Sequence, residues 1–210
     1  MQLQKTKAIL LSLLSICSTA SLIPLSVVTM PLAMSQSAQA AESKAIYGLI
    51  FDKWAQMGGS RSVLGNPITD ELPAARGGRY NEFPNGGFIY WHPNYGAQAV
   101  YGQIGQKWNQ LGRENGVGYP LTSERSGANG GRFNEFEDGK YIYWHPSTGA
   151  FLVYGDIAKQ WNSMGRERSR LGYPISDEQA VGSAGQRVSY FQGGAIYWNS
   201  GTRKISVTYR

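Results

Sequence analysis

The 210-residue chain is short of cysteine, charge and histidine, and each shortage excludes a class of protein. Its single cysteine, Cys17, stands in an apolar N-terminal stretch, so the rest of the chain has neither a disulfide bond nor a thiol nucleophile. Charged residues make up only 16% of the sequence, which excludes a long solvated coiled coil. Although 27 residues are glycine and 9 are proline, their share stays below that of low-complexity disorder and follows no collagen period. We therefore expect a folded globular protein.

The first forty residues differ in character from the rest of the chain. Lys5 and Lys7 precede an uncharged, mostly apolar run over 8–34, and a small-residue Ala-Gln-Ala site ends at Ala40. This order is typical of a secretory signal peptide, which we place at 1–40. The alternative is an uncleaved anchor, because the run is long enough to span a bilayer. Without Lys5 and Lys7 the formal charge falls from +6 to +4, and this mildly basic charge favours anionic wall polymers as partners over nucleic acid, which export removes from reach.

Two series of tryptophans and one series of turn prolines recur every 53 or 54 residues, which indicates an internal repeat. Three copies of one unit fill the chain after the signal peptide. We place them at 41–98, 99–152 and 153–210. The recurring residues are Trp54, Trp108 and Trp161 in one series, Trp91, Trp144 and Trp198 in the second, and Pro67, Pro120 and Pro174 in the turns.

Each unit opens with apolar residues at helical spacing and continues with a hairpin pattern. In the second unit Ile104, Trp108 and Leu111 form one helix face, and Gly112 follows it as a left-handed cap would. An Asp-Gly pair at Gly139 then separates two strand-like runs, which is typical of a hairpin turn. The sequence thus predicts an α+β fold, a tandem array of three compact β-rich repeats, each a short helix plus a small antiparallel sheet. A propeller is excluded, because three units are too few and the helix has no place in a blade.

The same unit resembles a known family in its helix, its Ile-Tyr-Trp strand and above all its turn. The turn stands here as Leu64-Gly65-Asn66-Pro67, Val117-Gly118-Tyr119-Pro120 and Leu171-Gly172-Tyr173-Pro174. Over 46–210 the sequence resembles the LGFP repeat family, which is named for a Leu-Gly-Phe-Pro turn. The resemblance implies a secreted, cell-wall-associated module that binds a peptidoglycan-linked glycan such as arabinogalactan, with cell-wall enzymes as possible partners.

The third unit departs from the pattern that the resemblance rests on. It has Tyr197-Trp198-Asn199-Ser200 where the other units have Tyr-Trp-His-Pro, and Tyr190 where they have glutamate. Terminal repeats of tandem arrays often differ in this way, because their outer face meets solvent. We expect the third unit to serve mainly as a cap.

Arginine and aromatic residues at equivalent positions are the candidates for ligand binding. An arginine fork grips carboxylate or phosphate, and an indole covers the apolar face of a sugar ring. The alternatives for each arginine are an internal ion pair with Glu71, Glu124 or Glu178, or simply a solvated position at the sheet edge. The alternative for the strand tryptophans is a structural role, since they or the tyrosines beside them must face inward. The candidate ligand-binding residues are Arg79, Arg132, Arg187, Trp91, Trp144, Trp198, Tyr119 and Tyr173.

Catalysis is not expected, and no cofactor or metal is implied. His92 and His145 are the only histidines, and neither has a second ligand at metal spacing. Glu82 and Glu135 occupy like positions in separate units, whereas a glycosidase needs two carboxyls in unlike environments. The competing hypotheses are a non-catalytic wall-polysaccharide module, a structural spacer or adaptor for a protein partner, and a secreted glycoside hydrolase.

Overall fold

Each repeat folds into a short helix and one four-stranded antiparallel sheet, as the sequence predicts, and the second repeat adds a further helix of four residues. The structure is a computed structural model that describes residues 43–182 and 185–210, all within one compact unit. The signal-peptide prediction over 1–40 lies outside the described residues. Among the residues that are described, no helix is long and apolar enough to cross a membrane.

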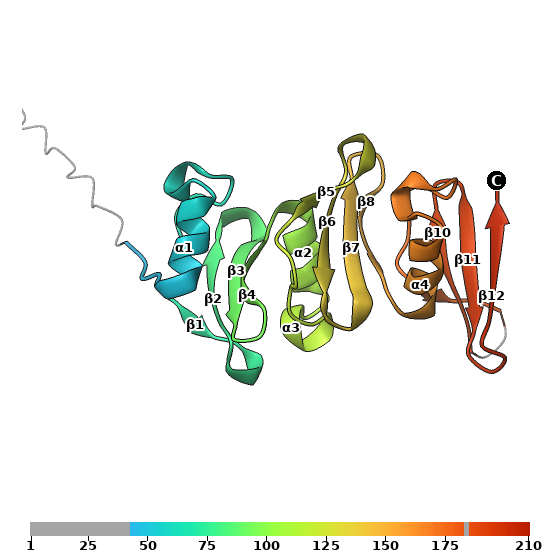
Figure 1. The fold of residues 1–210 in the computed structure, drawn as a ribbon, viewed down its shortest axis with the longest axis horizontal. Coiled ribbons are helices and arrows are strands. Elements are labelled where there is room, and N and C mark those ends of the chain that lie inside the picture. Colours follow the sequence, from blue (N-terminus) through green and yellow to red (C-terminus); the bar gives the residue numbers. More distant parts are fainter. Residues whose placement is uncertain (1–42, 183–184) are drawn as a thin grey trace, which may run out of the picture. The chain divides into compact units, whose positions relative to one another are not determined.

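The element order repeats three times along the chain (Figure 1). The sheets have the strand orders β1-β2-β3-β4, β5-β6-β7-β8 and β12-β11-β10-β9, so neighbours in sequence are neighbours in space. The first repeat contains α1 Gly48–Gln56, β1 Leu72–Pro73, β2 Arg79–Phe83, β3 Gly87–His92 and β4 Gly96–Val100. The second contains α2 Gly102–Gln110, α3 Arg113–Gly116, β5 Arg125–Ser126, β6 Arg132–Phe136, β7 Lys140–His145 and β8 Gly149–Val153. The third contains α4 Gly155–Ser163, β9 Gln179–Ala180, β10 Gln186–Phe191, β11 Gly194–Asn199 and β12 Lys204–Tyr209.

The predicted helix ends and hairpin turns are confirmed by the backbone. Gly112 follows α2 with a φ of 85°, a left-handed value that costs glycine nothing because it has no Cβ. Asn85 and Gly86 join β2 to β3 with φ values of 58° and 74°, the positive values for which Asn-Gly is suited. Local sequence chemistry therefore fixes where each element begins and ends.

The hydrophobic cores lie between repeats as well as inside them. Helix α2 contacts β3 of the first sheet and also β7 and β8 of its own sheet, and α4 likewise contacts β7 and β11. One cluster of buried residues joins sheet 1 to α2 and sheet 2, and another joins sheet 2 to α4 and sheet 3. Helices and sheets therefore alternate as layers, and each inner helix is covered on two sides.

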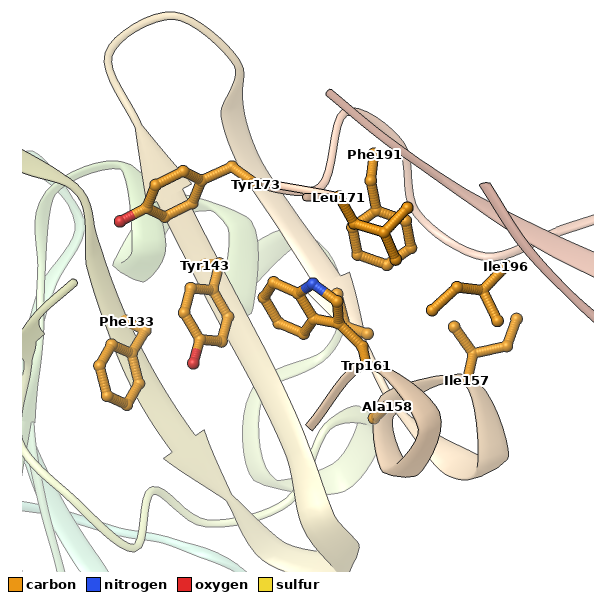
Figure 2. Packing of buried hydrophobic residues seen from close by; sticks show 10 residues of the cluster. Phe133, Tyr143, Ile157, Ala158, Trp161, Leu171, Tyr173, Phe191 and Ile196 are labelled. Atoms are coloured by element: carbon orange, nitrogen blue, oxygen red, sulfur yellow. The ribbon is translucent and has the colours of Figure 1, made fainter. Parts of the chain in front are cut away.

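The junction between the second and third repeats shows how these shared cores are packed (Figure 2). Tyr143 of β7 lies between Phe133 of β6 and Trp161 of α4, and the rings of Tyr143 and Trp161 meet edge to face at 4.8 Å. The first junction has the same contact, with Tyr90 and Trp108 also 4.8 Å apart. Trp108 and Trp161 are 0% exposed, whereas Trp54, with a sheet on one side only, is half-buried. The core role expected for these helix tryptophans is confirmed, but the core is shared between units.

The first junction requires a glycine in its helix. A Cβ on Gly105 would stand 2.0 Å from the carbonyl oxygen of Gly86, in the hairpin turn of the preceding repeat. We expect Gly105→Ala to lower the free energy of unfolding by about 1–3 kcal/mol through overpacking, although alanine favours a helix by about 1 kcal/mol. Urea unfolding followed by circular dichroism measures the change.

The matched control for this substitution is Ala158→Gly, at the equivalent position of α4. Ala158 is buried at the second junction. Removing its methyl group is expected to cost about 1 kcal/mol, from helix propensity and lost packing. A Gly105→Ala protein more stable than the parent would show that the first junction is looser than described.

Candidate functional site

The two aromatic faces of the central hairpin strand have different roles. Tyr90 and Tyr143 are buried at the junctions, against Trp108 and Trp161. The tryptophans beside them on the strand point to the opposite face and are half-buried. Of these strand aromatics, Trp91 and Trp144 rather than Tyr90 and Tyr143 are therefore available to a ligand.

The aromatic surface expected at Tyr119 and Tyr173 is not available, and this prediction is wrong. The two side chains are 1% and 2% exposed. Each ring packs on the histidine of the preceding repeat, Tyr119 on His92 and Tyr173 on His145, at 4.6 Å in both cases. A turn residue usually faces solvent, but here the preceding repeat covers it.

Charged side chains complete both junctions in the same pattern. Arg113 donates to the Glu82 carboxylate at 2.8 Å, and Arg166 lies 3.8 Å from Glu135. The next residue in each case, Glu114 or Glu167, accepts a hydrogen bond from a backbone N–H of the preceding repeat at 3.3 Å. The glutamates weighed as a glycosidase pair thus each have an ion-pair partner in the following repeat.

A third carboxylate, Glu137, is held at the first junction by groups from both repeats. It accepts hydrogen bonds from Arg76 and from the Tyr95 hydroxyl in the first repeat, and from the Tyr119 backbone N–H. Desolvation by itself raises the pKa of Glu137, but Arg76 and the other donors outweigh it and leave the pKa below its usual value. Glu137 is therefore ionised at neutral pH and ties the two repeats together.

The histidines serve this packing. His92 is buried and stacks on Tyr95 at 4.9 Å, while the Nε2 of His145 lies 3.0 Å from the carbonyl oxygen of Asn129. Within the described residues, no group of three His, Cys, Asp or Glu side chains is placed to hold a metal ion.

The outer repeats depart from the pattern at positions that face a neighbour in the described junctions. The first repeat follows no other described repeat, and it has Gly59, Ser60 and Asn66 at the positions of Arg113, Glu114 and Tyr119. At the other end, Tyr190 and Asn199 replace the glutamate and histidine that a following repeat would contact. These differences agree with the expectation that the third unit acts as a cap.

The predicted arginines and strand tryptophans come together in every repeat. They stand directly opposite each other on neighbouring antiparallel strands, so their side chains lie on one face of the sheet. The registered pairs are Arg79 with Trp91, Arg132 with Trp144, and Arg187 with Trp198.

Two of these pairs open into equivalent pockets. The first pocket, of 240 Å³, is lined by Trp91, Arg79, Glu71 and residues 47–50 at the start of α1. The second, of 450 Å³, is lined by Trp144, Arg132, Glu124 and residues 101–104 at the start of α2, with further residues from the first repeat. All three tryptophans pack against a core on one side, but in the third repeat the indole nitrogen of Trp198 is buried without a hydrogen-bond partner. The site recurs, but its three copies are not identical.

Each site arginine is paired with the loop glutamate of its own repeat, the alternative that the sequence left open. Arg132 lies 3.4 Å from Glu124, and Arg79 and Arg187 pair in the same way with Glu71 and Glu178. The arginine side chains stay 37–47% exposed while the glutamates are 7–11% exposed. The carboxylates fix the guanidinium groups, and each arginine keeps an outward edge for a ligand.

A tyrosine before each helix belongs to the site and was not predicted. Tyr101 lines the second pocket, where burial first and then Glu124 raise the pKa of its hydroxyl to about 12. Burial also raises the pKa of Glu124, against the opposing effects of Tyr101 and Arg132. The sequence signal that could have identified these tyrosines is a Tyr-Gly pair that recurs in every repeat, with the tyrosines at 47, 101 and 154. The glycines that follow them have φ values of 48°, 58° and 60°. Those glycines require positive φ, which turns the chain into the helix beside the pocket.

Two solved structures are distantly similar to this chain. One is the extracellular domain assigned to the one component system BT4673 from B. thetaiotaomicron, at 12% identity and a TM-score of 0.20, over 69% of this chain and 16% of that one. Another is the G-box domain of the microcephaly protein CPAP, at 12% identity and a TM-score of 0.18, over 67% of both chains. The chain thus spans less than a fifth of the first structure, and TM-scores this low carry no argument about fold.

The match to a family model is more informative. No curated protein is significantly similar in sequence. The model of the LGFP repeat matches three consecutive segments, 64–116, 117–169 and 171–209, each of which begins at or next to the Gly-x-Pro turn. These segments cover more than half of the chain and follow the period of the sheets and helices. The chain belongs to the LGFP repeat family.

Proposed function

We propose that the protein is a non-catalytic module that binds cell-wall polysaccharide outside the cell and anchors to the envelope. LGFP repeats occur in secreted and cell-wall-associated proteins. The observation that carries the proposal is the tryptophan–arginine pair that opens into a pocket in consecutive repeats. An indole face covers the apolar face of a sugar ring, and an arginine edge binds hydroxyl or acidic groups around it. The ligand class is a peptidoglycan-linked glycan such as arabinogalactan.

Repetition gives such a module its physical advantage. Sites with individually weak affinity become effective when one chain presents several of them to a repetitive polymer. Linkage of this kind raises avidity by roughly 10² to 10⁴. Because the repeats share their cores, the pockets are also held at fixed spacing on one folded unit.

Co-sedimentation with isolated cell-wall sacculi tests the proposal. The purified protein is mixed with sacculi that keep or lack their covalently attached polysaccharide, across a series of salt concentrations. We expect binding to the intact sacculi and loss of at least tenfold after the polysaccharide is stripped. A steep salt dependence would show that the arginines contribute more to the binding affinity than the tryptophans do, because salt screens exposed charges. Equal binding to both preparations would contradict a glycan ligand.

A second candidate function, an adaptor for a protein partner such as a cell-wall enzyme, is favoured by exposed apolar side chains at the start of the first helix. Tyr47, Leu49 and Phe51 are 63%, 54% and 44% exposed, whereas the inner helices are covered on two sides. Exposed apolar clusters of this kind often mark protein contacts. If Leu49→Ser with Phe51→Ser abolishes wall association while binding to purified polysaccharide persists, the adaptor function is preferred.

A further inference from the structure

The pockets of consecutive repeats differ at a small set of equivalent positions around the tryptophan–arginine pair. Two positions lie on the helix beside the pair. They hold Leu49 and Asp52 in the first repeat, Gln103 and Gln106 in the second, and Asp156 and Lys159 in the third.

A third position lies at the tip of the hairpin that the preceding repeat contributes. It holds Asn85 at the first junction and Asp138 at the second, both with a φ of 58°. The first repeat has no preceding hairpin among the described residues. Taken together, only the middle pocket has a neutral amide at every one of these positions.

The middle pocket is built by two repeats, which explains its larger volume. Val63 and Asn85 of the first repeat line it together with Gln103 and Gln106 of α2. Gln106 is fixed against the hairpin tip, since a Cβ on Gly86 would stand 2.9 Å from its Cγ atom. The 450 Å³ of this pocket compares with 240 Å³ in the first repeat.

The charges in the middle pocket cancel locally. Arg132 and Glu124, which line the same pocket as the amides, lie 3.4 Å apart. At the corresponding place in the third repeat, Asp156 and Lys159 pair with each other at 2.9 Å, and Asp138 pairs with Lys140 at 3.5 Å. A neutral sugar entering there would compete with charged groups that already satisfy one another. In the middle pocket the same sugar meets amides, each of which offers both donors and an acceptor to hydroxyl groups.

We propose that the pocket between the first and second repeats is the principal glycan site, and that it takes a neutral sugar residue stacked on Trp144 and hydrogen-bonded by Asn85, Gln103 and Gln106. This inference rests on the proposed function, and it makes the binding sites unequal. The outer repeats contribute secondary contacts along the polymer, and the amide positions of the middle repeat set its specificity.

The test replaces the amides with the residues of the third repeat and compares tryptophans at equivalent positions. Gln103→Asp combined with Gln106→Lys alters two exposed side chains, so the fold is retained. Trp144→Ala removes the indole on which the sugar is proposed to stack, and Trp91→Ala is its matched control in the first repeat. The probes are neutral arabinogalactan oligosaccharides and carboxylate-bearing peptidoglycan fragments, titrated into the full protein by calorimetry.

We expect the double glutamine variant and Trp144→Ala each to weaken binding of the neutral oligosaccharide at least tenfold, and Trp91→Ala to weaken it less than twofold. Equal losses from the two tryptophan variants, or an unchanged affinity of the double glutamine variant, would overturn the inference and leave the proposed function standing. Binding of the acidic fragments alone would overturn the neutral-sugar assignment. No binding of either probe or of sacculi by the parent protein would overturn both proposals.

Discussion

Replacing Trp161 with alanine is expected to lower the free energy of unfolding by about 3–5 kcal/mol, the usual cost of removing a large buried aromatic side chain. Trp161 is fully buried, with its ring 4.8 Å from Tyr143 of the preceding sheet and 5.3 Å from Phe191 of its own sheet. The cavity would open on both sides of α4, so the third repeat would lose contact with the second as well as its own core. Urea unfolding monitored by far-ultraviolet circular dichroism measures the loss.

The matched control is Trp54→Ala, the same substitution at the equivalent position of the first helix. Trp54 packs on one sheet only and remains partly exposed, although its indole N–H donates to the Gly65 carbonyl at 2.8 Å. Its removal is expected to cost about half as much, because less apolar surface is returned to water. Equal costs for the two variants would show that the helices are not covered on two sides at the inner positions.

The second large effect is expected at the Gly-x-Pro turn of the second repeat. Tyr119→Asn introduces the residue that the first repeat has at Asn66. The substitution removes a buried ring that packs on His92 at 4.6 Å and on Tyr90 at 5.9 Å, and it removes the hydroxyl that donates to the Ala75 carbonyl. We expect a loss of about 3 kcal/mol and a second unfolding step, because the first repeat would be uncoupled from the others.

The reciprocal variant, Asn66→Tyr, separates a junction effect from an effect of the turn itself. No described repeat precedes the first, so the new ring would have nothing to pack against, and the change in unfolding free energy is expected to stay within about 0.5 kcal/mol. If both variants were equally destabilising, the tyrosine would act within its own turn.

The repeat period, the helix faces and the hairpin turns could all be predicted from the sequence because each rests on local chemistry. A stripe such as Ile104, Trp108 and Leu111 identifies the buried face of a helix, and Gly112 identifies its end. The stripe does not say which neighbour covers it. The sharing of cores between repeats therefore emerged only from the structure, where Trp108 contacts both Tyr90 and Phe136.

The misplacement of Tyr119 and Tyr173 has the same cause. Turn residues usually face solvent, and the period carries no information about the contact between one turn and the preceding hairpin. A signal was nevertheless present, since Asn66 replaces the tyrosine only in the repeat that follows no other. Differences between an end unit and an inner unit mark the positions that face a neighbour.

The arginine and tryptophan of the candidate site could be predicted from the sequence, but the residues that surround them could not. Arg132 and Trp144 lie opposite each other because the hairpin turn between their strands sets the register. The position of that turn and the lengths of the two strands can be predicted from the sequence. The pairing of Arg132 with Glu124 depends on the path of a loop, and the sequence left it as one of three possibilities. The amides from two repeats that surround Trp144 could not be assigned to one pocket before the repeats were placed side by side.

The most direct test of glycan binding at these pockets is the response of the six indole N–H signals in a ¹H–¹⁵N spectrum of the protein as wall polysaccharide oligosaccharides are added. The account predicts a saturable shift of the Trp144 signal, a smaller shift for Trp91, and no shift for the buried Trp108 and Trp161. A spectrum in which none of the six signals moves while the oligosaccharide binds, or in which only the buried pair moves, would contradict it.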